Sequence, residues 1–214
     1  VIPVDIAAAK AAASAVPVRE TEQVSLIDAT GRVLAREVRA AIDLPPFDNS
    51  AMDGYAVRIA DFSGPGPWWL SIGGRIAAGD FFEEGLRQPN AAVRIFTGAP
   101  VPDGFDAVVM QEQCERVGDH ITIARRPRQG ENIRFSGEDV RAGQSVLDTG
   151  SDLSPQRMAL LAGQGLVDIE VIRKVRIGLV STGSELRDPG TPLARGAIYN
   201  SNRIMIRAMM SPFP

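Results

Sequence analysis

Short polar side chains that could do chemistry gather in residues 47–57. Within seven positions there are two carboxylates, an amide, a hydroxyl and a glycine, which are Asp48, Asn49, Ser50, Asp53 and Gly54. Aspartate and asparagine fold back onto nearby backbone amides and glycine permits a positive φ, so this pattern predicts a compact polar loop. On residue chemistry alone, a capped turn is slightly favoured over a ligand site.

The composition restricts which chemistry is possible. The chain has 214 residues with one histidine, His120, and one cysteine, Cys114. These numbers exclude a His/Cys zinc site, and they exclude a Ser-His or Cys-His catalytic dyad unless His120 serves. His120 follows a Gly-Asp pair between two apolar runs, which predicts an exposed residue just after a hairpin turn. Any catalysis must therefore use carboxylates, hydroxyls, basic groups, backbone amides and a metal ion that the protein binds.

The composition also bears on location and partners. A net charge of −3 gives no general attraction to nucleic acid or to anionic membranes. No apolar run is long enough to span a bilayer, and no signal peptide is visible. A single cysteine rules out an internal disulfide and fits a reducing compartment. We therefore expect a cytoplasmic protein with no nucleic-acid and no membrane partner.

Two further groups of residues could bind an anion. The first is a basic patch made of Arg125, Arg126, Arg128 and Arg134. Such a patch is usually a solvated face, but neighbouring glycines leave backbone amides that an anionic ligand could use. The second is a turn rich in hydroxyls and glycine at residues 181–185, which follows an apolar run at residues 175–180. Open α/β sheets bind ligands where a buried parallel strand ends in such a turn.

Three helices can be expected from capping residues. Asp5 is expected to cap a helix in an alanine-rich stretch, and Ser154 with Pro155 begins a second helix. Asn200 and its neighbours are expected to cap a third helix at residues 203–210. Residues 57–123 instead contain short apolar runs between Gly/Pro turns, which predicts a small β barrel or sandwich.

Four separated segments together resemble the molybdopterin molybdenumtransferase family, which is MoeA in bacteria and the E domain of gephyrin in animals. The segments are residues 46–58, residues 97–102 with 106–112, residues 132–134 with 137–139, and residues 181–186 with 198–203. The first is a long, near-unique signature. The order and spacing of all four fit the family over essentially the whole chain.

The resemblance implies a function in molybdenum cofactor biosynthesis. The family inserts molybdate into adenylylated molybdopterin, with Mg²⁺-assisted release of AMP. The resemblance also implies a homodimer, with the site between the β-rich domain of one subunit and the α/β domain of the other. Molybdopterin adenylyltransferase would be the upstream partner. The expected protein is thus an enzyme, a transferase that uses Mg²⁺ and takes molybdate and a pterin nucleotide as substrates.

The family's functional positions fall on particular residues of this chain. The catalytic positions are Asp53, Thr97, Asp139 and Glu185, of which Asp53 and Glu185 are the expected metal ligands. The expected cofactor-binding positions are Ser50, Gly98, Arg134, Ser181, Thr182 and Gly183. The chemistry is compatible, because Mg²⁺ takes hard oxygen ligands and usually one or two carboxylates with phosphate oxygens. Thr97 and Gly98 are expected to offer a hydroxyl and an exposed amide to an oxyanion, and the turn at residues 181–183 to do the same.

The expected fold class is α+β and multidomain. A discontinuous N-terminal domain takes residues 1–46 and 140–173. An inserted β-rich, barrel-like domain takes residues 47–139, and a doubly wound α/β molybdopterin-binding domain begins at residues 174–214.

The chain departs from the family in two respects. Phe135 and Ser136 stand where relatives often carry basic residues, and the chain has roughly half of the family's length. The alternatives to an active transferase are therefore a non-catalytic molybdopterin-binding or scaffold module and a truncated fragment without transfer activity.

Overall fold

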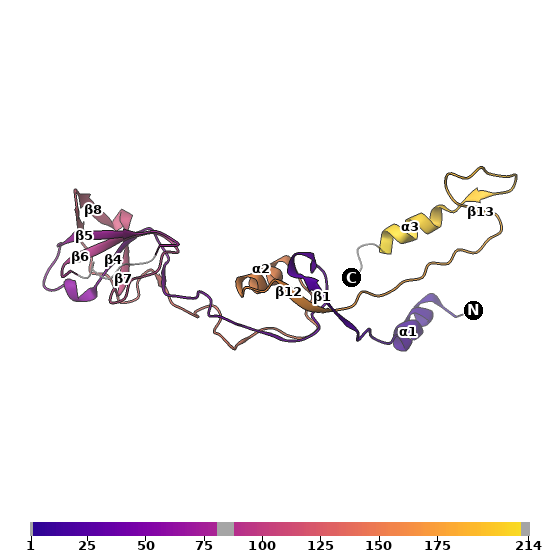
Figure 1. Ribbon diagram of the computed structural model, residues 1–214, viewed down its shortest axis with the longest axis horizontal. Helices are drawn as coiled ribbons and strands as arrows, with labels where there is room; N and C mark the ends of the chain where they lie inside the picture. Colours follow the sequence, from indigo (N-terminus) through magenta and orange to yellow (C-terminus); the bar gives the residue numbers. More distant parts are fainter. Residues whose placement is uncertain (1, 81–87, 211–214) are drawn as a thin grey trace. The chain divides into compact units, whose positions relative to one another are not determined.

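The structure, a computed structural model, describes residues 2–80 and 88–210. The chain divides into two compact units, and many of their elements are labelled in Figure 1. Unit 1 consists of Val1–Val38 and Ser145–Pro214, and unit 2 is the continuous segment Arg39–Gln144. Each unit combines strands with helical turns, so the chain is of the α+β class.

Unit 2 is mostly β structure. Its elements are β3 (Asn49–Ser50), β4 (Gly54–Val57), η2 (Ile59–Asp61), β5 (Trp68–Ile76), β6 (Ala91–Ile95), β7 (Ala107–Met110), η3 (Gln111–Gln113), β8 (Cys114–Val117), β9 (His120–Ile123) and β10 (Ile133–Arg134). Six strands form one sheet in the order β7-β4-β6-β5-β9-β8. All neighbours in it are antiparallel except β5 and β6, which are parallel. The expected β character is confirmed for the described part of residues 57–123, while residues 81–87 lie outside the described residues.

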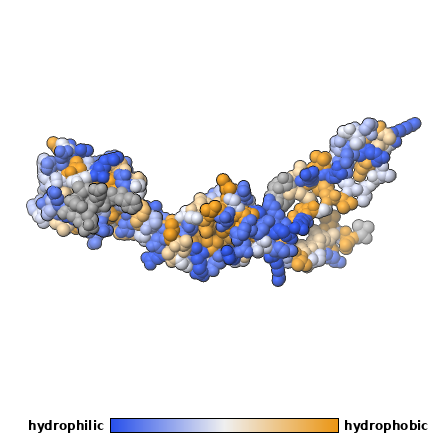
Figure 2. Space-filling model, viewed as in Figure 1, coloured by the Kyte–Doolittle hydropathy of each residue, from blue (hydrophilic) through white to orange (hydrophobic). Residues whose placement is uncertain are grey.

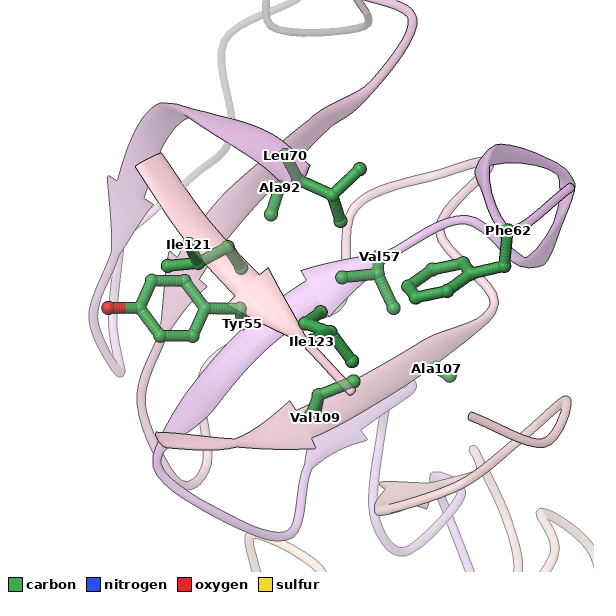
Figure 3. Close-up of a cluster of buried hydrophobic side chains, with 9 residues drawn as sticks. All are labelled: Tyr55, Val57, Phe62, Leu70, Ala92, Ala107, Val109, Ile121 and Ile123. Carbon is green, nitrogen blue, oxygen red and sulfur yellow. The ribbon is translucent and has the colours of Figure 1, made fainter. Parts of the chain in front are cut away.

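The six-stranded sheet curls around an apolar cluster. The buried members are Tyr55, Val57, Phe62, Leu70, Ala92, Ala107, Val109, Ile121 and Ile123 (Figure 3). Val109 comes from β7 and Ile123 from β9, which are separated in the sheet by three other strands. Side chains from strands so far apart in the order meet in one cluster only if the sheet is strongly bent. A second cluster around Ile95 and Val108 buries the alternate side chains, so β4 is buried on both faces.

His120 lies where the sequence predicts. β8 and β9 form an antiparallel hairpin in which Val117 faces His120 across the turn at Gly118 and Asp119. His120 is exposed at the start of β9.

Unit 1 contains a small two-stranded sheet with a helix against it. Its elements are α1 (Val4–Ser14), β1 (Thr21–Ser25), η1 (Leu26–Asp28), β11 (Ser145–Leu147), α2 (Pro155–Gly163), β12 (Asp168–Ile172), β13 (Leu186–Arg187), β14 (Ile198–Tyr199) and α3 (Ser201–Met210). β1 pairs antiparallel with β12. A short strand at the boundary of the two units, β2 (Val38–Arg39), pairs with β11. The core of this sheet and helix is aliphatic and includes Leu34, Leu153, Leu161 and Val171.

Two of the three predicted helix starts are confirmed. The Ser154 hydroxyl accepts a hydrogen bond from the Arg157 amide at the start of α2. The Asn200 side chain accepts one from the Arg203 amide at 3.1 Å at the start of α3. The prediction for Asp5 is wrong, because Pro3 is the N-cap of α1 and Asp5 lies inside the first turn. An acidic side chain there favours the helix through its dipole instead of through a capping hydrogen bond.

The predicted buried strand at residues 175–180 is also wrong. These residues carry no secondary structure, and Val175, Ile177 and Val180 are exposed. A strand requires hydrogen-bonding neighbours, and no described segment pairs with this one. Downstream, β13 and β14 form a short parallel pair.

Unit 1 carries an apolar groove beside α2. Its lining includes Leu26, Ile27, Met158, Leu166 and Val167, and Figure 2 shows hydrophobic side chains gathered on the part of the molecule that holds α2. Across the described residues, none of the helices is both long enough and apolar enough to cross a membrane.

Candidate functional site

Asp53 and Thr97 form the best-defined contact among the predicted site residues. The Thr97 amide donates a hydrogen bond to Asp53 Oδ1 at 2.9 Å, and the Thr97 hydroxyl donates to the same oxygen at 3.0 Å. Asp53 immediately precedes β4 and Thr97 follows β6, and Gly54 lies opposite Ile95 in this antiparallel pair. The start of one antiparallel strand lies beside the end of its neighbour, so the pairing of β4 with β6 brings these two residues together.

The hydrogen bonds from Thr97 make Asp53 a stronger acid. The Thr97 amide is the largest cause and the Thr97 hydroxyl the second, and together they lower the pKa of the Asp53 carboxyl below its usual value of 3.8. Desolvation opposes this lowering of the pKa, and the positive charge of Arg94 adds to it. No hydrogen-bond donor among the described residues meets the second oxygen, Oδ2. Asp53 therefore presents an ionised, exposed oxygen at neutral pH.

Ser50 and Gly98 hold the turn that carries Thr97. The Gly98 amide donates to the Ser50 carbonyl at 2.8 Å, and the Ser50 amide donates to the Ala99 carbonyl at 3.0 Å. The Ser50 side chain is buried, and its hydroxyl donates to the Met52 carbonyl at 2.6 Å. Gly98 has a φ of +80°, which glycine adopts without strain. In this structure both residues shape the loop that places Thr97 beside Asp53.

These contacts bear on the expectation that Thr97 and Gly98 offer a hydroxyl and an amide to an oxyanion. Both of their amides already donate to protein acceptors, and the Thr97 hydroxyl donates to Asp53. An oxyanion would have to compete with these bonds. The geometry instead makes Thr97 the residue that orients the Asp53 carboxylate.

Arg134 and Asp139 form a second polar group of the predicted site. The Arg134 guanidinium donates to Glu138 Oε1 at 2.6 Å and also pairs with Asp139. Both carboxylates raise the pKa of Arg134, with the Glu138 hydrogen bond the largest cause. β10 pairs antiparallel with β3, so that Arg134 lies opposite Asn49. Because β3 also binds the Thr97 turn through Ser50, this short strand connects both polar groups of unit 2.

Two of the four arginines of the basic patch, Arg125 and Arg134, form ion pairs within the protein. Arg125 forms an ion pair with Glu131, and the Glu131 carboxylate also accepts a hydrogen bond from the Arg128 amide at 2.8 Å. The Arg125 hydrogen bond is the largest cause of a lowered Glu131 pKa. This part of the patch is therefore a self-neutralised surface, as the usual interpretation of such patches holds.

Glu185, Ser181, Thr182 and Gly183 lie in unit 1, in an exposed turn before β13. The Glu185 carboxylate folds back over Gly183. A β carbon at Gly183 would lie 2.7 Å from each of its oxygens, and Gly183 has a φ of +148°. Only glycine fits this arrangement without displacing the carboxylate.

Unit 2 also has a cavity beside the loop that follows Thr97. This cavity of about 510 Å³ is lined mainly by the loop 100–106 and by Phe47, Asp48 and Phe135. None of the predicted catalytic residues is in its lining. Within residues 2–80 and 88–210, no three His, Cys, Asp or Glu side chains gather in a way that could hold a metal. A metal at Asp53 would therefore need oxygen ligands from a substrate as well.

Sequence reasoning missed Arg94 and Gln111, which contact the Asp53 segment directly. Arg94 donates to the Gly54 carbonyl at 2.9 Å and to the Gln111 side chain. The signal was present, because Arg94 is the single charged residue of β6, a strand whose other residues are buried and apolar. A charge in such a strand requires partners, and these come from the loop next to Asp53.

The chain is similar in sequence to a known protein family and to several named proteins. Residues 2–165 match the family model described as MoeA N-terminal region (domain I and II). A molybdopterin molybdenumtransferase of Haemophilus influenzae is 42% identical over 89% of this chain and 47% of its own length. Molybdopterin molybdenumtransferase 2 of Mycobacterium tuberculosis is 46% identical over 86% of this chain and 46% of its own.

Solved structures agree with these matches. The crystal structure of a molybdopterin biosynthesis moeA protein from Pyrococcus horikoshii OT3 has a TM-score of 0.80 and 38% identity, over 91% of this chain and 52% of that one. The chain thus spans about half the length of the curated relatives it matches. Since the family model covers most of the chain, including the Asp53–Thr97 pair, the chain belongs to the MoeA N-terminal region family.

Proposed function

We propose that this chain is part of a molybdopterin molybdenumtransferase, which inserts molybdate into adenylylated molybdopterin and releases AMP. The names of the relatives support molybdenum cofactor biosynthesis as the process. The observation that carries the proposal is the Asp53–Thr97 pair, which lies on the family's functional positions. Thr97 donates two hydrogen bonds to one oxygen of the Asp53 carboxylate and so holds the carboxylate in a fixed orientation.

The chain's own residues supply binding and orientation. Thr97 fixes one oxygen of Asp53, so that the other oxygen, Oδ2, faces an incoming ligand with its charge intact. Arg134 offers a positive charge that its two carboxylate partners hold in place. Asp139 in turn limits how much net positive charge Arg134 presents, which favours a ligand that carries a cation along with its phosphates.

Asp53 fits Mg²⁺ as a single carboxylate ligand, because it is exposed, ionised and open at Oδ2. We propose that Asp53 is a ligand of the ion, which when bound would neutralise the negative charge of the nucleotide phosphates. Family membership suggests the role of metal ligand for Glu185 as well. Ser181, Thr182 and Gly183 are the proposed contacts of the pterin nucleotide in unit 1, and Ser50 and Gly98 support the loop in unit 2.

The remaining assignments follow from family membership and are also proposals. They are a homodimer, a cytoplasmic location, a molybdopterin adenylyltransferase as the upstream partner, and the division into domains at residues 1–46 with 140–173, 47–139 and 174–214. Sedimentation of the purified protein tests the dimer directly. A monomer at all concentrations would contradict it.

The test of function is molybdate-dependent AMP release from adenylylated molybdopterin by the intact protein. Asp53→Asn is expected to lose most of this activity, because it removes the charge but keeps the shape of the side chain. Asp48→Asn is the matched control, since Asp48 is in the same loop but its carboxylate accepts a hydrogen bond from the Ser136 amide. A rate of AMP release by Asp53→Asn equal to that of the wild type would contradict the proposal.

Two other outcomes would favour the alternatives. Tight molybdopterin binding with no AMP release under any divalent metal would favour a binding or scaffold module. An intact mass near 22.9 kDa for the natural protein would favour a short form without transfer activity, because the matched relatives are about twice as long.

A further inference from the structure

Arg94 is held by four neighbours on the same side of unit 2. Its guanidinium donates to the Gly54 carbonyl and to the Gln111 side chain. It also lies over two aromatic rings, 5.2 Å from the centroid of Tyr55 and 4.6 Å from that of Phe96. A planar cation stacked on rings and fixed by two acceptors has little freedom to move.

The residues that Arg94 touches are the chain neighbours of the Asp53–Thr97 pair. Gly54 directly follows Asp53, and Phe96 directly precedes Thr97. Gln111 connects Arg94 to Asp53 itself, because the backbone amide of Gln111 donates a hydrogen bond to the Asp53 carbonyl at 3.0 Å. Arg94 and Gln111 therefore fix both the segment that carries the carboxylate and the segment that donates to it.

We propose that Arg94 and Gln111 are positioning residues that hold the Asp53 carboxylate and Thr97 in register, so that Asp53 Oδ2 stays aimed at its ligand. This inference rests on the proposed function for the identity of the ligand, but the arrangement itself does not. Neither residue touches the Asp53 carboxylate by a hydrogen bond among the described residues. Both act through the backbone on either side of it.

The competing explanation is that Arg94 has a purely structural role. Comparison with Arg75 distinguishes a structural role from a positioning role. Arg75 lies opposite Arg94 in the β5–β6 pair and also stacks over Phe96, at 4.8 Å from the centroid. Within the described part of the chain, it makes no hydrogen bond to the segment around Asp53. Arg75 thus shares the sheet position and the ring contact of Arg94 but lacks the link to Asp53.

The test compares three variants of the intact protein. Arg94→Lys keeps the positive charge but cannot span two acceptors with a planar fork. Gln111→Met keeps the length of the side chain but removes the acceptor, and Arg75→Lys is the matched control. The Asp53 pKa is followed by carbon NMR on protein with ¹³C-labelled aspartate, with Asp53→Asn to assign the signal. AMP release and the thermal midpoint are measured on the same samples.

We expect the Asp53 pKa to rise toward its usual value in Arg94→Lys and in Gln111→Met, because the Thr97 hydrogen bonds loosen. We expect kcat for AMP release to fall about tenfold or more, as small displacements of a reacting group cost that much. Arg75→Lys should leave both quantities unchanged.

An unchanged Asp53 titration in the folded Arg94→Lys and Gln111→Met proteins would overturn the inference, as would an equal effect of Arg75→Lys. If Arg94→Lys does not fold, the Gln111→Met titration decides. A wild-type protein that releases no AMP refutes the proposed function alone, because the Asp53 titration still confirms or refutes the positioning role.

Discussion

Gly54 lies directly against the carbonyl of Val109. A β carbon at Gly54 would come within 2.1 Å of that oxygen, which no side chain could tolerate. The contact lets β4 and β7 approach closely at the residue that follows Asp53. The sheet therefore fixes the backbone of the candidate site at a position where only glycine fits.

Gly54→Ala is accordingly expected to destabilise unit 2. The added methyl group forces β4 away from β7, and overpacking of this kind costs about 1–3 kcal/mol. Urea denaturation followed by tryptophan fluorescence measures the change, since both tryptophans are in β5. Gly178→Ala is the control, because a β carbon at Gly178 meets nothing within 4 Å. Equal stability of the two variants would contradict the close approach.

Thr97→Val is expected to raise the pKa of Asp53. The variant removes the hydroxyl donor and keeps the shape and the amide, so part of the lowering remains. Because the folded-state pKa of Asp53 lies below its usual value of 3.8, the stabilisation is present above that value and is lost as the pH falls through the folded pKa. In Thr97→Val this stabilisation should be smaller, and its loss should be complete at a higher pH.

Carbon NMR titration of Asp53 and acid denaturation both measure the effect of Thr97→Val. Thr191→Val serves as control, because the Thr191 hydroxyl donates to the Asp188 carbonyl in unit 1. Identical titration of Asp53 in wild type and Thr97→Val would show that the hydroxyl bond is absent in solution.

Arg32→Met is expected to weaken unit 1. Arg32 is a buried arginine that pairs with Glu22 and donates to the Ile172 carbonyl at 2.8 Å. Its loss leaves the Ile172 carbonyl without this donor, which costs about 1–3 kcal/mol for a buried acceptor. Arg19→Met, a change at an exposed arginine, is the control in a denaturant titration monitored by circular dichroism. A free energy of unfolding that does not change would mean that the contacts of Arg32 are dispensable.

The same ion pair makes a prediction about acid. The Arg32 hydrogen bond is the largest cause of a lowered Glu22 pKa, below the usual 4.5. The stabilisation it gives is therefore present above pH 4.5 and is lost as the pH falls through the folded pKa. Glu22→Gln should remove this part of the acid sensitivity, and denaturant titrations at pH 7 and at lower pH would show it. A protein whose acid sensitivity survives in Glu22→Gln would contradict it.

Cys114 is expected to react slowly with thiol reagents. Burial raises the pKa of the Cys114 thiol from 9.0 to about 11, and the Cys114 side chain packs against the cluster of Figure 3. At pH 8 the thiolate fraction, and hence the labelling rate, should be about a hundredfold lower in the native protein than in urea. Iodoacetamide labelling read by mass spectrometry measures this ratio, with Cys114→Ser as the blank. Equal rates would place the thiol in solvent.

Local features of the fold could be predicted because they depend on residues close in sequence. The caps of α2 and α3 each involve donors three residues away, and the hairpin turn before His120 is set by Gly118 and Asp119. The same reasoning failed for Asp5, because Pro3 and Asp5 are only two positions apart and the local sequence did not decide which of them is the N-cap. It failed for residues 175–180, because an apolar β-type run does not supply its own hydrogen-bonding neighbour.

The sequence by itself determined the β character of unit 2 and the family. Only the tertiary structure decided what the site residues contact. Thr97 is 44 positions from Asp53, and it reaches Asp53 because β4 and β6 pair in one particular register. Arg94 and Gln111 enter the site for the same reason. Register is set by the packing of the whole sheet, so no local pattern around Asp53 could have named its partners.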